Sequence, residues 1–317
     1  MRLKLVPDQT NLPFMGIRKI AFALSGVLAV LSVVFLIIFG LNFGIDFRGG
    51  VLIEVKTPGP ANLGSMRSAL SELGLGEVAL QEFGAVDDVL IRIERQPGDS
   101  KAQERAVDMV KETLTDLIGP GISYRRVEVV GPKVSGELVR KGALALLLAL
   151  VAMLVYVAFR FELKFSIGAV AALTHDVILT FGFFAVTGLE FNLSIVAAIL
   201  TIVGYSMNDT VVVYDRVREN LRKYKKMELA DLLDLSVNQT LSRTVMTSLT
   251  TLLALIALAV FGGSVIAGFT MAMIWGVVIG TYSSVFVAAP ILLLLGVRRG
   301  TEEEADSGET EEAVERT

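Results

Sequence analysis

Six long apolar runs constrain the fold of this 317-residue sequence more than any other feature. Each run has roughly the length, about 20 residues, that an α-helix needs to cross the hydrocarbon core of a bilayer. A membrane-spanning backbone must satisfy its own hydrogen bonds, so we expect each run to be helical. The runs cover residues 21–41, 142–159, 166–186, 193–213, 244–261 and 266–295. The sequence therefore predicts an α-helical polytopic membrane protein with six transmembrane helices.

A stretch of lower hydropathy separates the first run from the second. Arg18 and Lys19 precede the first run, which is too long for the apolar region of a cleaved signal peptide, so we expect a retained helix. The stretch then shows strand and helix patterns in the order β-α-β-β-α-β, which is typical of a ferredoxin-like α+β domain. The expected strands are residues 51–56, 78–83, 89–94 and 122–130, and the expected helices are residues 62–73 and 101–118.

These patterns divide the chain into four parts. We expect residues 1–41 to form the N-terminus and the first helix, and residues 42–140 to form the inserted α+β domain. Residues 141–299 then carry the other five helices. Residues 300–317 are strongly acidic and nearly free of large apolar side chains, so we expect a disordered tail.

The distribution of Lys and Arg over the short loops predicts the orientation. These residues occur at positions 160 and 164, between 216 and 226, and at 298 and 299, whereas the loops near residue 190 and at 262–264 have none. Loops rich in Lys and Arg stay in the cytoplasm. Both termini are therefore expected in the cytoplasm, with residues 42–140 on the far side of the membrane.

The composition excludes several kinds of site. The chain has no cysteine, which excludes disulfides, thiolate metal sites and a cysteine nucleophile, and its single histidine excludes a multi-histidine metal site. Residues 44–50 (GIDFRGG) lack the spacing of a phosphate-binding loop, and Gly49 and Gly50 favour a turn into the first strand. We therefore expect no enzyme activity, no cofactor, no metal and no nucleic-acid partner.

Asp209 is the strongest candidate for a functional residue, because an ionisable side chain inside an apolar run is costly in lipid. On a helix, Asn208 and Asp209 are expected on one polar side, where they act either in a proton relay or as hydrogen-bonding groups that fix helix packing. Asp215 lies nearer the membrane surface. We expect it to form a solvated ion pair there, beside Arg216 and Arg218, or to be a secondary relay member.

Three further groups of residues lie in or at the edge of the apolar runs. His175 and Asp176 in the third run form either a packed pair or a second relay. Arg243 is expected to enter the fifth helix in a polar stripe or to extend to the interface. The remaining members of that stripe are Gln239, Thr247 and Thr251. The sixth run has a ridge of small residues, which favours close helix packing: Gly268, Ala272, Gly276, Gly280, Ser284 and Ala288.

Five segments together resemble the SecF family of bacterial protein-export membrane proteins, within the resistance-nodulation-division superfamily. They are residues 44–50, 130–136 (VGPKVSG), 204–220 (GYSMNDTVVVYDRVREN), 238–251 and 280–284 (GTYSS). The resemblance implies a bacterial inner-membrane protein whose residues 42–140 lie in the periplasm. It implies SecD as partner, with SecYEG, a preprotein and YajC as further partners, and use of the proton-motive force. It also implies a proton path through Asp209 and Arg243, with Asn208 beside them.

Three other classes of protein compete with this interpretation. A half-subunit of a proton-driven small-molecule or lipid exporter belongs to the same superfamily, but such exporters usually have two six-helix halves in one chain. An intramembrane aspartyl protease needs two carboxylates on facing helices, and Tyr214-Asp215 supplies half of that signature with no Gly-X-Gly-Asp after it. An assembly scaffold would tolerate substitution of the carboxylates.

Overall fold

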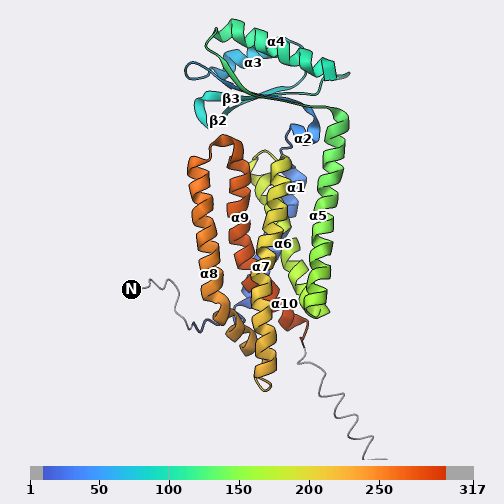
Figure 1. The fold of residues 1–317 in the computed structure, drawn as a ribbon, viewed down its shortest axis with the longest axis vertical. Helices are drawn as coiled ribbons and strands as arrows, with labels where there is room; N and C mark the ends of the chain where they lie inside the picture. Colours follow the sequence, from blue (N-terminus) through green and yellow to red (C-terminus); the bar gives the residue numbers. More distant parts are fainter. Residues whose placement is uncertain (1–9, 99, 298–317) are drawn as a thin grey trace, which may run out of the picture.

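The computed structural model describes residues 10–98 and 100–297 of the chain, and it consists of a helical bundle with an α+β domain at one end (Figure 1). Six helical segments in this described part are long and apolar enough to cross a membrane, which confirms the six expected spans. They are α1 (Arg18–Phe39), α5 (Pro132–Arg160), α6 (Leu163–Thr187), α7 (Leu193–Lys223), α8 (Leu229–Phe261) and a sixth span that consists of α9 (Ala267–Ser283), the π-helical turn η2 (Ser284–Ala288) and α10 (Ala289–Leu294). The acidic tail lies outside the described residues.

The α+β domain has the expected order of elements. Its strands form one antiparallel sheet in the order β2-β3-β1-β4, which is the order of the ferredoxin-like fold. The elements are β1 (Gly50–Lys56), α3 (Leu63–Ser71), β2 (Val78–Phe83), β3 (Ala85–Ile93), α4 (Ser100–Ile118) and β4 (Ser123–Val130). Helices α3 and α4 cover the sheet face that is turned away from the bundle (Figure 1).

Alternation of side chains along β1 gives the sheet two apolar faces. Val51, Ile53 and Val55 pack in the core under α3 and α4, whereas Leu52 points to the opposite face and packs with Ile45. Successive strand residues point to opposite faces, so one short strand contributes to both clusters. The second cluster faces the bundle and includes α2 (Ile45–Arg48), the short helix between α1 and β1.

Three membrane helices extend beyond the apolar runs. Helix α5 begins at Pro132, directly after β4, with Pro in the first turn where its missing N–H costs no hydrogen bond. Helix α7 continues to Lys223 and α8 begins at Leu229, so both project past the apolar region at the end opposite the domain. Hydropathy marks the part of a helix that meets lipid, whereas the helix itself ends where its terminal N–H and C=O groups find other partners.

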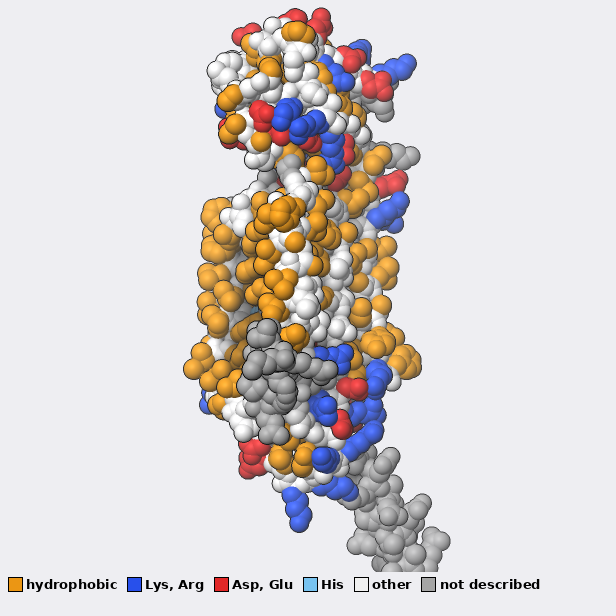
Figure 2. Space-filling model, turned by 60° about the vertical axis from the view of Figure 1, so that its left-hand side comes forward, with side chains coloured by type: hydrophobic (Ala, Val, Ile, Leu, Met, Phe, Trp, Pro, Cys, Tyr) orange, Lys and Arg blue, Asp and Glu red, His pale blue; other side chains and the backbone are white. Residues whose placement is uncertain are grey.

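On the face shown in Figure 2, apolar side chains form a belt over the bundle, with charged side chains at both ends. We call the end that carries the α+β domain the domain end. The opposite end, where Lys and Arg gather, we call the basic end. In the bundle, α6, α7 and the sixth span are the most buried of the six, while α1, α5 and α8 lie on the outside.

Candidate functional site

Asp209 lies near the middle of α7 and is buried between three helices, with 9% of its surface exposed. The Thr244 hydroxyl on α8 donates to its Oδ1 at 2.6 Å, and the Ser284 hydroxyl, at the start of the π-helical turn, donates to its Oδ2 at 2.6 Å. Neutral hydroxyls therefore take the place that a cation would take at a buried carboxylate. Such a carboxylate is costly to keep charged, which makes Asp209 a natural place to bind a proton.

Arg243 precedes Thr244 on α8 but is exposed on this chain. Its charge is near enough to act on Asp209, yet within the described residues the two side chains form no ion pair. Adjacent residues of a helix point about 100° apart, which is why Thr244 faces Asp209 and Arg243 does not. The guanidinium can reach the carboxylate only if α8 moves or the arginine changes its rotamer.

Asn208 does not share the buried face of Asp209, and the expectation of a common polar side is wrong. Asn208 is exposed, together with Thr201 and Asp215, which lie seven residues before and after it. These three positions form one stripe on the outside of α7, since seven residues are close to two helical turns. Asn208 is therefore placed to contact lipid or another chain.

Further polar groups lie along the contacts of α7, α8 and the sixth span. One turn nearer the domain end, the Tyr205 hydroxyl donates to Ser248 Oγ at 3.3 Å, and Ser248 Oγ lies 2.6 Å from Thr281 Oγ1. Nearer the basic end, Asn220 Nδ2 donates to Ser236 Oγ and to Gln239 Oε1, both at 2.9 Å. Hydroxyl and amide groups both donate and accept hydrogen bonds, so polar contacts continue along these helix interfaces on either side of Asp209.

A second buried carboxylate, Asp176, lies on α6. Its Oδ1 is 3.0 Å from His175 Nδ1, and its Oδ2 accepts hydrogen bonds from Ser206 at 2.6 Å and Ser283 at 2.7 Å. The two residues form a pair within one helix, but their partners come from α7 and α9. Helix α6 therefore carries a second buried, hydrogen-bonded carboxylate in addition to Asp209 on α7.

Asp215 is exposed and forms an ion pair with Arg160 on α5, with 2.9 Å between Nη2 and Oδ1. Of its expected basic neighbours, Arg216 pairs with Glu219 instead, and Arg218 donates to the Arg160 carbonyl. An exposed pair of this kind contributes little to stability. Asp215 therefore lies at the basic end, where no described carboxylate from a facing helix shares its environment, and this speaks against the aspartyl-protease interpretation.

The ridge of small residues on the sixth span packs against α7. A methyl group at Gly276 would overlap the Ile202 side chain, and one at Gly280 would lie 3.0 Å from Ser206 Cβ. At Gly268, in contrast, a methyl group would meet Ile195 at an ordinary 3.5 Å. Ser284 belongs to the same ridge, but its hydroxyl also binds Asp209. The close approach at Gly276 and Gly280 brings Ser283 and Ser284 to the two carboxylates.

The segment between α1 and β1 binds the α6–α7 loop at the domain end. Backbone hydrogen bonds join Phe191 N to Asn42 O at 2.8 Å and Gly44 N to Phe191 O at 2.9 Å. Asp46 Oδ2 accepts a hydrogen bond from the Leu193 N–H, at the first residue of α7. A side chain at Gly44 would collide with the Glu190 carboxylate. We call residues 42–50 together with this loop the junction.

Gly49 and Gly50 complete the junction by turning the chain into β1. Both have positive φ, at 74° and 120°, and a side chain at Gly50 would collide with the Ile93 carbonyl. Only glycine adopts these conformations without strain. The two residues thus form a turn between α2 and the sheet.

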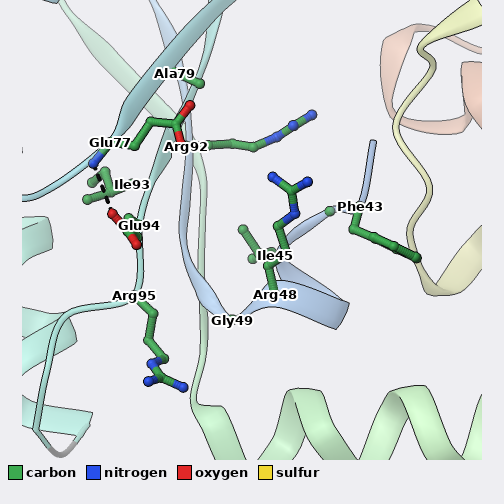
Figure 3. Close-up of a pocket in the computed structure, with 11 residues that line it drawn as sticks. Phe43, Ile45, Arg48, Gly49, Glu77, Ala79, Arg92, Ile93, Glu94 and Arg95 are labelled. Carbon is green, nitrogen blue, oxygen red and sulfur yellow. Dashed lines mark hydrogen bonds between the residues drawn. The ribbon is translucent and has the colours of Figure 1, made fainter. Parts of the chain in front are cut away.

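An ion pair also crosses the junction. Arg92 on β3 bonds to Glu190 of the α6–α7 loop through Nη2 and to Asn42 Oδ1 through Nη1. Arg92 lines a pocket of about 290 Å³ between α2 and the sheet, in which Figure 3 shows the Arg48 and Arg92 guanidinium groups pointing to the same region. The α+β domain is therefore tied by its sheet, as well as by its two chain connections, to the start of α7.

The sequence pattern missed the partners that hold the candidate residues. Ser206, Ser283 and Ser284 are small residues in apolar helices, and serine is common in such positions for packing alone. Asp46 lies in a segment singled out for its glycines. The signal that could have found the serines is their periodicity, because Ser206 lies three residues before Asp209 on the buried side of α7.

Fold and site together define a multi-pass membrane protein of the transport class, with buried carboxylates in its bundle and an α+β domain tied to the helix that carries one of them. Residues 109–298 match the family described as protein export membrane protein SecD/SecF, C-terminal, and residues 34–57 match the SecD/SecF GG motif. The chain belongs to the SecF family of protein translocase subunits.

Individual relatives agree with this assignment. The protein translocase subunit SecF of Rickettsia typhi is 45% identical over 299 residues, which cover 94% of this chain and 96% of the relative. The corresponding protein of Rickettsia prowazekii is 44% identical, covering 94% of this chain and 95% of the relative.

Two solved structures of SecDF are similar over nearly the whole chain. The crystal structure of SecDF from Thermus thermophilus, a translocon-associated membrane protein, matches with a TM-score of 0.81 and 35% identity, over 93% of this chain and 40% of that one. SecDF in its super-membrane-facing form matches with a TM-score of 0.66 and 34% identity, over 96% of this chain and 41% of that one. This chain thus spans about two fifths of the SecDF structures.

Proposed function

We propose that this chain is a subunit of a SecD–SecF complex that uses the proton-motive force to promote late steps of preprotein translocation through SecYEG. Membership of the SecF family supports this role, and so does the similarity to SecDF, which is described as translocon-associated. SecD is the partner we expect, with YajC as a further one, because the solved structures that this chain resembles are of SecDF. The protein acts mechanically, without covalent chemistry.

The environment of Asp209 is the observation that carries the proposal. It is a buried carboxylate between α7, α8 and the sixth span, bound by two hydroxyls and by no cation among the described residues. Burying a charged carboxylate inside a membrane protein costs free energy, and binding a proton removes that cost. Asp209 is the proton-carrying residue in our proposal.

Arg243 decides when the proton is held. An exposed guanidinium one residue from Thr244 favours the ionised carboxylate when it approaches and the protonated one when it withdraws. Movement of α8 against α7 therefore couples proton binding to a change in the bundle. One charge crossing the membrane releases about 2.3 kcal/mol per 100 mV, which matches the size of a modest conformational bias.

The junction passes this change to the α+β domain. In the proposed orientation the domain end faces the periplasm, and both termini face the cytoplasm, where Lys and Arg concentrate. A shift of α7 acts on Asp46 and Glu190, which hold residues 42–50 and β3. The domain is then placed to keep an emerging polypeptide from sliding back.

Proton flux in proteoliposomes tests the proposal. The full chain is reconstituted with its SecD, and proton entry and preprotein export are measured under an imposed membrane potential. Asp209→Asn keeps the shape of the side chain but cannot carry a proton, so flux should fall to the level of protein-free liposomes. Asp231→Asn, the same change at an exposed position on α8, is the control and should leave flux unchanged. Wild-type flux in an assembled Asp209→Asn complex would refute the proposal.

A further inference from the structure

Two adjacent serines in the sixth span contact two different buried carboxylates. Ser283 ends α9 and donates to Asp176 Oδ2 at 2.7 Å. Ser284 begins the π-helical turn and donates to Asp209 Oδ2 at 2.6 Å. Since Asp176 lies on α6 and Asp209 lies on α7, the serine pair joins carboxylates of two helices.

Asp176 is buried more deeply than Asp209, with 1% of its surface exposed. The groups that face it are Ser206 from α7, Ser283 from α9 and His175 from its own helix. None of the described Lys or Arg side chains forms an ion pair with it. A deeply buried carboxylate without a cation is stable only if a proton neutralises it or the histidine beside it becomes charged.

His175 offers the second place for such a proton. Its side chain is 8% exposed, and Nε2 is a buried atom for which the described residues provide no hydrogen-bond partner. With the proton on Nδ1 and shared with Asp176, Nε2 remains free to accept another. The imidazole ring packs near the ring of Tyr282, at 6.3 Å between centroids, and the Tyr282 hydroxyl contacts Ser25 Oγ of α1 at 2.9 Å.

Each serine hydroxyl has two acceptors within reach. Ser283 Oγ lies 3.2 Å from the Gly280 carbonyl, and Ser284 Oγ lies 3.0 Å from the Thr281 carbonyl. A hydroxyl has one hydrogen and can donate it well to only one of these acceptors. It donates to the carboxylate while that group is ionised, because the charged oxygen is the stronger acceptor. When the carboxylate takes up a proton, its own O–H donates to the serine oxygen, and the serine hydrogen turns to the helix carbonyl.

The two serines also mark a change in the helix. The π-helical turn runs from Ser284 to Ala288, and single π-turns inside α-helices are frequent at functional sites. A hydroxyl that turns toward the carbonyl of the preceding turn acts on the hydrogen-bond ladder where its register changes. Ser283 and Ser284 are adjacent in this ladder, so a change at the serine that binds one carboxylate can reach the serine that binds the other.

We propose that the His175–Asp176 pair is a second proton-binding site of the bundle, and that Ser283 and Ser284 couple its protonation to that of Asp209. The inference rests on the proposed function only in its assumption that the proton on Asp209 drives transport. Coupling between the two sites is a property of this chain and is measured without transport.

The single histidine of the chain allows a direct measurement. The full chain, purified through a tag without histidine, is labelled with ¹⁵N-histidine and placed in lipid nanodiscs. Magnetic resonance of the two ring nitrogens is then followed as a function of pH, which reports the tautomer and the protonation of His175. In the wild-type chain we expect a Nδ1–H tautomer whose signals titrate with pH.

The coupling is tested by substitution. Asp209→Asn should move the His175 midpoint by about one pH unit, the size at which two sites titrate as a coupled pair. The same substitution in a Ser283→Ala, Ser284→Ala background should move the midpoint by less than half as much. Thr270→Ala is the matched control, because its hydroxyl lies on the same helix as Ser283 but donates to the Ile266 carbonyl and to no carboxylate. In that background the full shift should remain.

Two results would overturn the inference. The first is a wild-type His175 whose ring signals do not change with pH between 4 and 9, a range that spans the ordinary pKa of histidine by about 2.5 units on each side. The second is a midpoint shift that persists undiminished without the two serine hydroxyls. Failure of the proposed function is distinct from both results. It would appear as normal proton flux in Asp209→Asn, which is a separate measurement from the titration of His175.

Discussion

The Asp46 carboxylate accepts a hydrogen bond of 2.8 Å from the backbone N–H of Leu193, the first residue of α7. Asn192, the residue before α7, accepts from Ser194 N at 3.1 Å, so two side chains satisfy N–H groups at this helix end. A negative charge there also interacts favourably with the helix dipole. Asp46 belongs to the α+β side of the junction, so it links that domain directly to the helix that carries Asp209.

Removal of this link should uncouple the domain from the bundle. We expect Asp46→Ala to destabilise the start of α7 by about 1 kcal/mol, the usual cost of losing a helix cap. Preprotein export in proteoliposomes should fall while proton flux continues, because Asp209 and its hydroxyl partners are untouched. Asp46→Asn keeps an acceptor and should retain most of the export. Equal loss of flux and export in Asp46→Ala would show that the junction supports the fold rather than the coupling.

The α7 contact of the sixth span gives a prediction on stability. Gly276→Ala introduces a methyl group where Ile202 leaves no room, at a cost of about 1–3 kcal/mol for overpacking. Gly268→Ala adds the same group to the same helix at an ordinary contact distance. Gly276 lies in the helix interior, where the gain in helix propensity is at least as large as at Gly268 in the first turn, so a lower midpoint for Gly276→Ala is a packing effect. Thermal unfolding in detergent should show a lower midpoint for Gly276→Ala only, and equal midpoints would contradict the close contact.

Local patterns in the sequence predicted the elements but not the contacts between them. Apolar runs and strand alternation depend on residues within one segment, so the six spans and the order β-α-β-β-α-β are visible without a structure. The bonds from Ser284 to Asp209 and from Asp46 to Leu193 depend on how helices and loops far apart in the sequence are positioned. No periodicity within one helix contains that information.

Asn208 shows where closer attention to helix geometry would have helped. Its neighbours at seven-residue spacing, Thr201 and Asp215, are polar, whereas Asp209 shares a face with Ile202 and Val213. That pattern separates an outer polar stripe from an inner apolar face that contains one carboxylate. The sequence could therefore have shown that Asp209, and not Asn208, faces the interior of the bundle. It could not have shown which hydroxyls bind Asp209.

Single cysteines test the orientation of the chain. The sequence has none, so each introduced cysteine is unique. Glu112→Cys lies on the exposed side of α4, and Lys226→Cys lies in the α7–α8 loop at the basic end. In intact cells whose outer membrane has been made permeable, an impermeant thiol reagent should label the first position and spare the second. The reverse pattern would place the α+β domain in the cytoplasm and remove the basis for its contact with an exported polypeptide.

The exposure of Arg243 gives the last prediction. Arg243 directly precedes Thr244, whose hydroxyl binds Asp209, but its side chain is exposed on the outside of the bundle. Its guanidinium can therefore act on the Asp209 proton only in a different arrangement of α7 and α8. Arg243→Ala should therefore assemble normally with SecD and lose proton flux. Arg243→Lys keeps the charge without the planar fork and should retain part of the flux.

A charge-matched control separates this role from a general electrostatic effect. Arg222→Ala, an exposed arginine near the basic end of α7, controls for loss of positive charge and should leave flux unchanged. Normal flux in Arg243→Ala would mean that the arginine only anchors α8 at the membrane surface.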